Sequence, residues 1–137
     1  MTSIRKEILI DTDASTAWEA LRDFGALHER VARGFVIDSR LEDHEHTERV
    51  ITFVNGASAR ERLVACDDEH RRLVYSVVES SLGFAHHQSS VEVHDADPAV
   101  SGTRLVWTTD VLPDSVGPTV DAMMTQGAAA IATTLAR

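Results

Sequence analysis

The chain has 137 residues, of which 43% are apolar and 26% are charged, and its formal net charge is −9. That size and composition are typical of one globular domain with its own hydrophobic core, so we expect a single domain over residues 1–137. The acidic balance argues against nucleic acid as a partner, and no run approaches the roughly 18 apolar residues that insert into a membrane. The lone Cys66 excludes an internal disulfide, which favours a cytoplasmic location.

Patterns in the first half of the chain predict a strand, two short helices and two more strands. Apolar and polar residues alternate in the first strand, which therefore has one buried face. Asp13 is the expected N-cap of the first helix, in which Ala17, Trp18 and Leu21 recur at helical spacing before Gly25 ends it. The expected elements are Ser3–Ile10, Ala14–Arg22, Ala26–Ala32, Phe35–Leu41 and Arg49–Phe53.

The second half predicts four consecutive strands followed by one long amphipathic helix. The strands are Ala59–Ala65, Leu73–Glu79, His87–Val93 and Thr103–Val111, and the helix is Val116–Leu135. The helix carries an apolar stripe and is about 30 Å long at ~1.5 Å per residue, enough to cross a sheet. A helix that follows a curved antiparallel sheet can cover the concave face without filling it. The order of elements therefore predicts an α+β layered fold with an internal cavity for a small apolar molecule.

A series of short motifs carries a resemblance to a known family. They are Ala17-Trp18, Asp23-Phe24-Gly25, Arg60-Glu61-Arg62-Leu63, Asp67-Asp68-Glu69, Leu73-Val74-Tyr75, Val78-Glu79 and Thr103-Arg104-Leu105-Val106-Trp107. In their order and spacing the chain resembles the START-like (SRPBCC) helix-grip superfamily, and within it the bacterial polyketide cyclase/dehydrase group. The resemblance covers nearly the whole chain. It implies a curved seven-stranded antiparallel sheet wrapped on a long C-terminal helix, with two short helices after the first strand.

The chain departs from that group at three places. The group usually has Pro where Ala14 stands, an aromatic or Pro-containing segment at Arg30–Arg33, and commonly Tyr where this chain has His87. The third departure places an imidazole on a strand that is expected to face the cavity.

Strand parity suggests which polar side chains point into that cavity. Alternate residues of a strand share one face, so Tyr75 and Glu79 are expected to lie together on the concave side. The same argument places His87 there on the next strand, and Glu61 on the preceding strand beside Leu63. An imidazole with a pKa near ~6.5 can act as a general base at neutral pH.

The resemblance implies a chemistry for these four side chains, namely cyclisation and aromatisation of a polyketide by aldol closure and dehydration, without a cofactor. His87 would be the base, Tyr75 the donor to the enolate, and Glu61 or Glu79 the group that orients the imidazole. The partner would be a hydrophobic, aromatic or polyketide-like small molecule. The residues expected to contact it are Phe53, Leu63, Phe84, Val91, Trp107, Val120 and Met123.

Two loops, residues 54–58 and 80–85, flank the expected mouth of the cavity. The corresponding loops close over ligand in the abscisic-acid receptors of the superfamily, so Leu82 and Phe84 are expected lid residues. A dimer contact is the alternative use of exposed apolar residues, and the chain is expected to be a monomer or a homodimer.

Other interpretations of the same residues stay open. His87 could hydrogen-bond structurally, Glu61 and Glu79 could form ion pairs with arginines such as Arg49, and the aromatic residues could be plain core. The chain would then be a non-catalytic carrier of lipid or aromatic metabolites, or an interaction module with a filled core. A cavity of roughly 300 Å³ or more would favour ligand binding. We expect no metal, because the scattered histidines, such as His44 and His46, have no completing ligands at diagnostic spacing.

Overall fold

The structure is a computed structural model that describes residues 1–42, 44–45, 47–96 and 102–136. Within these residues the strands are β1 (Thr2–Ile10), β2 (Val36–Leu41), β3 (Glu48–Phe53), β4 (Ser58–Asp67), β5 (Arg72–Ser80), β6 (His86–Asp95) and β7 (Thr103–Leu112). The helices are α1 (Ala14–Arg22), α2 (Leu27–Arg30) and α3 (Gly117–Leu135), with 3₁₀ turns at Phe24–Ala26 and Asp114–Val116.

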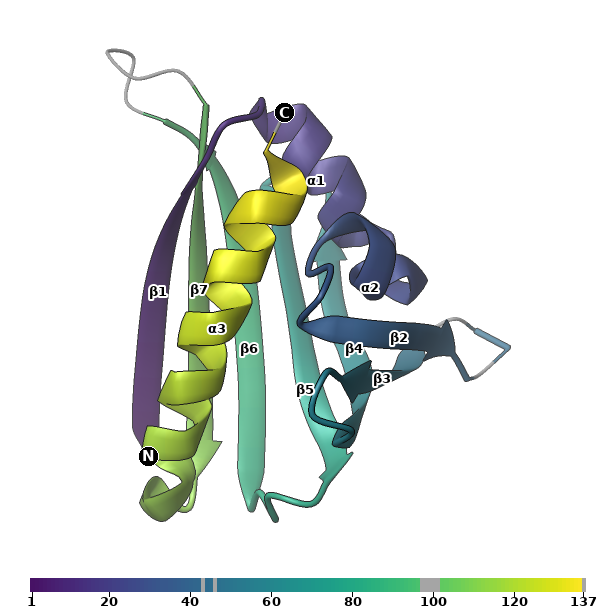
Figure 1. Cartoon of the computed structure of the whole chain (residues 1–137), viewed down its shortest axis with the longest axis vertical. Helices are drawn as coiled ribbons and strands as arrows, with labels where there is room; N and C mark the ends of the chain where they lie inside the picture. Colours follow the sequence, from purple (N-terminus) through teal and green to yellow (C-terminus); the bar gives the residue numbers. More distant parts are fainter. Residues whose placement is uncertain (43, 46, 97–101, 137) are drawn as a thin grey trace.

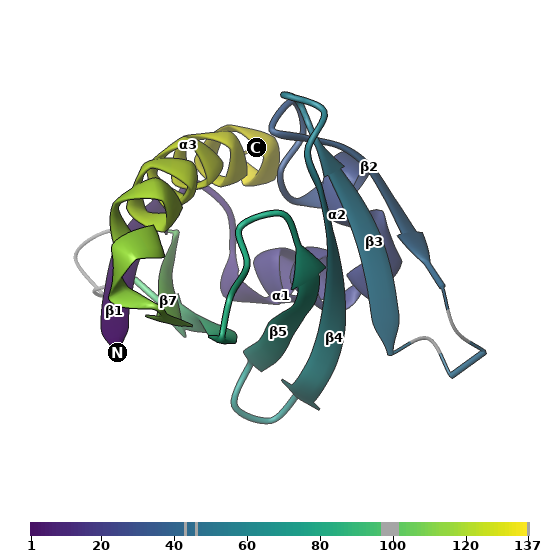
Figure 2. The same cartoon turned by 90° about the horizontal axis from the view of Figure 1, so that it is seen from below.

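In the described part of the chain the strands form a seven-stranded sheet in the order β1-β7-β6-β5-β4-β3-β2. Every neighbouring pair is antiparallel. The sheet is curved, and α3 lies across its concave face (Figures 1 and 2). Near the C-terminal end of α3, α1 and α2 close one end of the molecule (Figure 1). This arrangement confirms the predicted α+β class and helix-grip fold.

The two short helices agree with the sequence to different degrees. The first begins where predicted, because the side chain of Asp13 accepts a hydrogen bond from the Thr16 N–H at 2.7 Å. The second, predicted over Ala26–Ala32, is shorter, since α2 covers only four residues. The carbonyl of Ala32 accepts hydrogen bonds from N–H groups near the start of β2, and Gly34 has a φ of +87°. The chain has therefore already turned toward β2.

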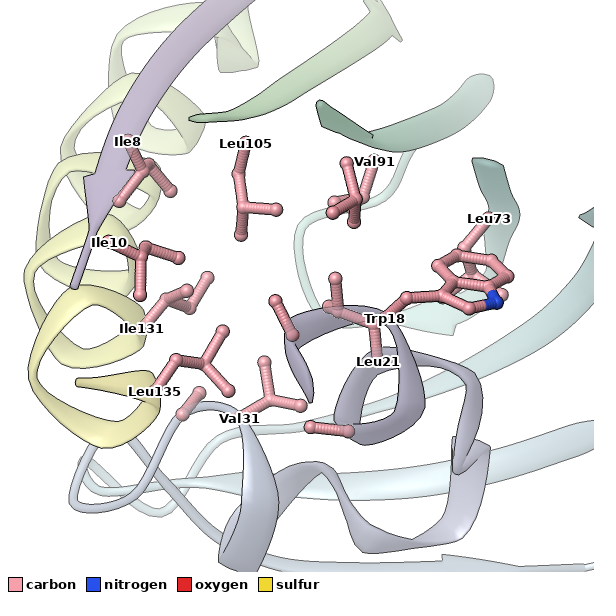
Figure 3. Packing of buried hydrophobic residues seen from close by; sticks show 14 of the residues in the cluster. Ile8, Ile10, Trp18, Leu21, Val31, Leu73, Val91, Leu105, Ile131 and Leu135 are labelled. Carbon is pink, nitrogen blue, oxygen red and sulfur yellow. The ribbon is translucent and has the colours of Figure 1, made fainter. Parts of the chain in front are cut away.

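The apolar core is concentrated at the end that α1 and α2 close. Trp18 from α1 and Val31 pack there with Ile131 and Leu135 from α3, while Leu105 contributes from β7 (Figure 3). A smaller apolar cluster lies around the first turns of α3, toward the β5–β6 loop. No helix in the described part of the chain is long and apolar enough to span a bilayer.

Candidate functional site

A cavity of about 120 Å³ lies between the helices and the concave face of the sheet. Its walls are mostly apolar and include Phe53, Phe84, Val91, Trp107, Val120 and Met123, all predicted from the sequence to face it. The volume is below the roughly 300 Å³ set out above, because aromatic rings occupy much of the space. Phe35 and Phe53, for example, pack edge to face with centroids 5.3 Å apart. A dry cavity of roughly 150 Å³ can hold benzene, so the volume suits one small ring.

Leu63, the seventh residue expected to contact ligand, does not line the cavity. It packs instead against the main apolar core. Leu63 lies closer than Glu61 to the β4–β5 turn, where the Asp68 carboxylate accepts a hydrogen bond from Trp18 Nε1–H at 2.9 Å. Its side chain therefore belongs to the end that α1 closes, and the prediction of a ligand contact is wrong.

Glu79 does not face the cavity either, and its side chain is 78% exposed. The cause is a bulge in β5: Arg60 pairs with Glu79 and Glu61 pairs with Val77, so Val78 has no partner of its own. One extra residue reverses the alternation of a strand. Parity counted from Tyr75 therefore fails beyond Val77, and the predicted placement of Glu79 on the concave face is wrong.

Glu61 lies in the cavity wall as predicted, with only 5% of its surface exposed. Its Oε1 accepts a hydrogen bond from Arg49 Nε at 2.8 Å and lies 2.7 Å from Arg49 Nη2 in an ion pair. Arg49 also donates to the Phe24 carbonyl at 3.1 Å, and its guanidinium lies 3.9 Å from the centroid of the Phe24 ring. The ion-pair interpretation of Glu61 is thus confirmed.

His87 lies where β5 and β6 separate. The pairing of these strands ends at Tyr75 and Ser89. Beyond that point the Val77 N–H donates to His87 Nδ1 at 3.0 Å, and the Ser76 hydroxyl donates to the His87 carbonyl. The imidazole therefore takes the place of the missing strand pairing, as the structural interpretation of this histidine proposed, while it also lines the cavity.

These contacts fix the proton on the His87 ring. A backbone N–H can only donate, so Nδ1 is unprotonated and the neutral ring carries its proton on Nε2. Burial lowers the pKa of His87 to about 4, which keeps the ring neutral at pH 7. In the described part of the chain Nε2 has no hydrogen-bond partner, and since no fully buried side-chain N or O there is unsatisfied, Nε2 must keep some accessible surface. Nε2 therefore opens onto the cavity as a donor, and His87 is not placed to be the base expected from the sequence.

Tyr75 is buried against the same cavity, and its ring centroid lies 6.1 Å from that of His87. Its Oη accepts a hydrogen bond from Trp107 Nε1–H at 3.2 Å. Burial, followed by the negative charge of Glu61, raises the pKa of Tyr75 to about 12. The phenol therefore stays protonated, and it also has a side-chain hydrogen bond with Ser89.

Arg49, which the sequence suggested only as an ion-pair partner, and a pair of hydroxyls on the face predicted by strand parity complete the polar part of the site. Arg49 reaches the cavity from β3, directly opposite Glu61 in the strand register. Ser89 and Thr109 form a buried hydroxyl pair at 2.6 Å. Arg49 could have been placed in the site from the strand register, because it lies opposite Glu61.

The loop between β5 and β6 covers part of the cavity. Leu82 and Phe84 both line it, and the Phe84 ring packs edge to face on His87 with centroids 5.0 Å apart. Among the described residues no group of three His, Cys, Asp or Glu side chains could hold a metal ion. His46, named above in that context, lies outside the described residues.

Comparison with known proteins gives the chain its family. A family model described as polyketide cyclase/dehydrase and lipid transport matches residues 1–137. The chain belongs to this family. Membership in the polyketide cyclase/dehydrase and lipid transport family implies a hydrophobic ligand.

Solved structures share the fold of this family member at low sequence identity. The Bacillus cereus protein XoxI is 16% identical with a TM-score of 0.84, and the match covers 98% of this chain and 96% of that one. The di-domain aromatase/cyclase BexL of the BE-7585A biosynthetic pathway is 12% identical with a TM-score of 0.81, covering 98% and 46%. Major latex-like protein 151 of Panax ginseng is 19% identical with a TM-score of 0.73, covering 96% and 95%. No curated protein sequence gives a significant match.

Proposed function

We propose that this chain is a single ligand-binding domain that holds a small, ring-containing hydrophobic molecule in its internal cavity. The observation that carries the proposal is a mostly apolar cavity with a few oriented polar groups, the usual composition of a small-molecule site. Family membership supports the same conclusion.

Binding without chemistry is favoured by the state of the ionisable groups. Glu79 points to solvent, Glu61 is held by Arg49, and His87 has already used its basic nitrogen on a backbone N–H. A general base needs a free lone pair within reach of the proton it removes, and His87 lacks one on the cavity side.

Cyclisation of a polyketide is the second candidate, supported by one observation besides the family name. Glu61 uses only Oε1 for Arg49, so its Oε2 remains as the acceptor for a proton removed beside a ketone. The resulting enolate oxygen would accept a hydrogen bond from His87 Nε2–H, and the enolate carbon would form the new bond to a second carbonyl. The oxygen of that carbonyl would become an alkoxide and take back the proton from Glu61. In this scheme Glu61 is the base and His87 is the hydrogen-bond donor, whereas the scheme based on the sequence has His87 as the base.

Two experiments test ligand binding. Extraction of protein purified from its own cells, followed by mass spectrometry, is expected to identify a bound apolar compound. In the second, Ala59→Leu fills part of the cavity from β4 and is expected to abolish binding of an environment-sensitive apolar dye, with Val64→Leu on the exposed side of β4 as the control. Equal dye binding by both variants, with no extracted compound, would contradict the proposal.

The cyclase candidate is tested by turnover of a synthetic poly-β-ketone. Glu61→Gln keeps the side-chain volume and is expected to abolish turnover while dye binding persists, whereas exposed Glu79→Gln is expected to retain it. If the unmodified protein binds the poly-β-ketone and leaves it unchanged, the non-catalytic function stands. A cytoplasmic location and a monomeric or homodimeric state stay predictions of the sequence.

A further inference from the structure

The polar atoms of the cavity differ in whether they already have partners. Ser89 and Thr109 bond to each other, and Trp107 donates to Tyr75. In the described part of the chain His87 Nε2–H has no such partner, although the side chain is only 8% exposed. No fully buried side-chain N or O in that part of the chain is unsatisfied, so Nε2 keeps some accessible surface within this largely buried residue. A donor in such surroundings gains stability when a ligand accepts its hydrogen bond. The cavity is therefore built to receive an acceptor at this point.

The orientation of that donor is fixed by the sheet. His87 Nδ1 is held by the Val77 N–H at 3.0 Å, while the Ser76 hydroxyl holds the His87 carbonyl. Phe84 packs on the ring from the loop side, with centroids 5.0 Å apart. A donor held from several sides is preorganised, so a ligand loses little free energy in ordering it.

The cavity offers no unpaired positive charge. Arg49 and Glu61 are the charged residues of its described lining, and they neutralise each other at 2.7 Å. A carboxylate moved into such a site would be buried without a counter-charge, which is strongly unfavourable. Lipid anions such as fatty acids do not match these groups, whereas an uncharged acceptor does.

Resting on the proposed function, we infer that the ligand is an uncharged ring compound with a carbonyl group whose oxygen accepts a hydrogen bond from His87 Nε2–H. The cavity volume of about 120 Å³ limits the part beside His87 to a single ring. The Tyr75 phenol lines the same cavity but already has hydrogen bonds with Trp107 and Ser89, so His87 is the donor that the ligand would use. Aromatic ketones, aldehydes and esters have this chemistry.

Three probes of nearly the same shape separate the effect of the carbonyl oxygen on affinity from the effect of charge. Acetophenone carries the carbonyl, α-methylstyrene replaces its oxygen by a methylene group, and benzoate adds a negative charge. His87→Asn places an amide oxygen near the position of Nδ1, which keeps an acceptor for the Val77 N–H, and removes the donor at Nε2. Glu79→Gln, outside the cavity, is the matched control. Affinities are measured by NMR titration of the folded full-length proteins.

We expect His87→Asn to weaken acetophenone about tenfold, as for loss of one hydrogen bond, and to change α-methylstyrene less than twofold. Benzoate is expected to bind at least tenfold more weakly than acetophenone. Comparing each probe across variants cancels the different cost of removing ketone and hydrocarbon from water. A second measurement needs no variant: the carbonyl stretch of ¹³C-labelled acetophenone is expected to shift to lower frequency on binding to the unmodified protein.

The outcomes distinguish this inference from the proposed function. Equal loss of both neutral probes in His87→Asn, an unshifted carbonyl stretch, or benzoate bound as tightly as the ketone would overturn the inference and leave ligand binding intact. Failure of all three probes and of the apolar dye to bind would overturn both.

Discussion

The two ends of the space between α3 and the sheet are built differently. At the end that α1 and α2 close, Trp18, Leu105 and Leu135 pack in an apolar core (Figure 3). Toward the β5–β6 loop, the same sheet and helix surround a cavity that contains an ion pair and an imidazole. The comparison indicates that the role of α3 changes gradually along its length: its residues from Val120 to Ile131 border the cavity, whereas Leu135 belongs to the core alone.

The largest loss of stability is expected from removing one partner of the buried ion pair in the cavity wall. Glu61→Leu leaves the Arg49 guanidinium buried without a partner, so it should lower the free energy of unfolding by about 3–5 kcal/mol. The double variant Arg49→Met/Glu61→Leu should recover most of the loss, because two apolar groups replace the pair. Urea denaturation measures both. A double variant as unstable as the single one would show that the pair is not the cause.

Two truncations compare the packing of the core end with the packing around the cavity. Leu105→Ala removes a fully buried side chain and should cost about 3–4 kcal/mol. Met123→Ala removes a half-buried side chain that already borders empty space, so it should cost about 1 kcal/mol. Thermal and urea unfolding test the difference. Similar losses in the two variants would mean that the two ends are packed alike.

Stability should depend on pH through the buried imidazole. The pKa of His87 is about 4 in the folded protein instead of its ordinary 6.5. As the pH falls from about 6.5 to 4, only the unfolded chain takes up this proton, so folding loses up to about 3 kcal/mol. Above pH 6.5 the contribution is constant.

Comparison of unfolding free energies for the unmodified protein and His87→Asn isolates this contribution from the titration of the carboxylates. The difference between the two proteins should change across that pH range and be flat above it. A constant difference from pH 4 to 8 would contradict a buried, neutral ring.

The smallest effect on stability is expected at Gly127, where α3 passes over the cavity. A Cβ there would lie 3.1 Å from the Trp107 ring and 3.3 Å from Phe35. Overpacking and the better helix propensity of alanine oppose each other, so Gly127→Ala should change stability by less than about 1 kcal/mol. Binding of acetophenone should nevertheless weaken, because the displaced indole enters the cavity. Calorimetry and NMR titration distinguish the two effects, and exposed Ala129→Gly is the control.

The fold could be predicted because every element has a repeating pattern. Alternation identified the strands, and a stripe ending at Ile131 and Leu135 identified the long helix, so their order predicted an α+β layered fold. The helix-grip fold itself came from the family resemblance. The site could be predicted only where the alternation is unbroken. Parity placed Tyr75 and Glu61 correctly, but nothing in the residue types near Val78 marks the bulge that turns Glu79 outward.

The role of His87 depended on information that no local pattern contains. The sequence placed the ring on the correct face, while its protonation depends on a Val77 N–H left unpaired where two strands separate. Separation of this kind is a property of sheet curvature. It is set by the whole sheet and is not encoded in a window of neighbouring residues.

The early end of the β5–β6 ladder has a mechanical consequence. Past Tyr75 and Ser89, these strands are joined by the two bonds that involve His87, one to Val77 and one from Ser76. The cavity wall can therefore widen between β5 and β6 with the loss of these two hydrogen bonds, while the neighbouring β6–β7 ladder remains intact. A ligand larger than one ring would enter by separating β5 from β6 here. The His87 side chain, which would donate to the ligand oxygen, also holds these two strands together.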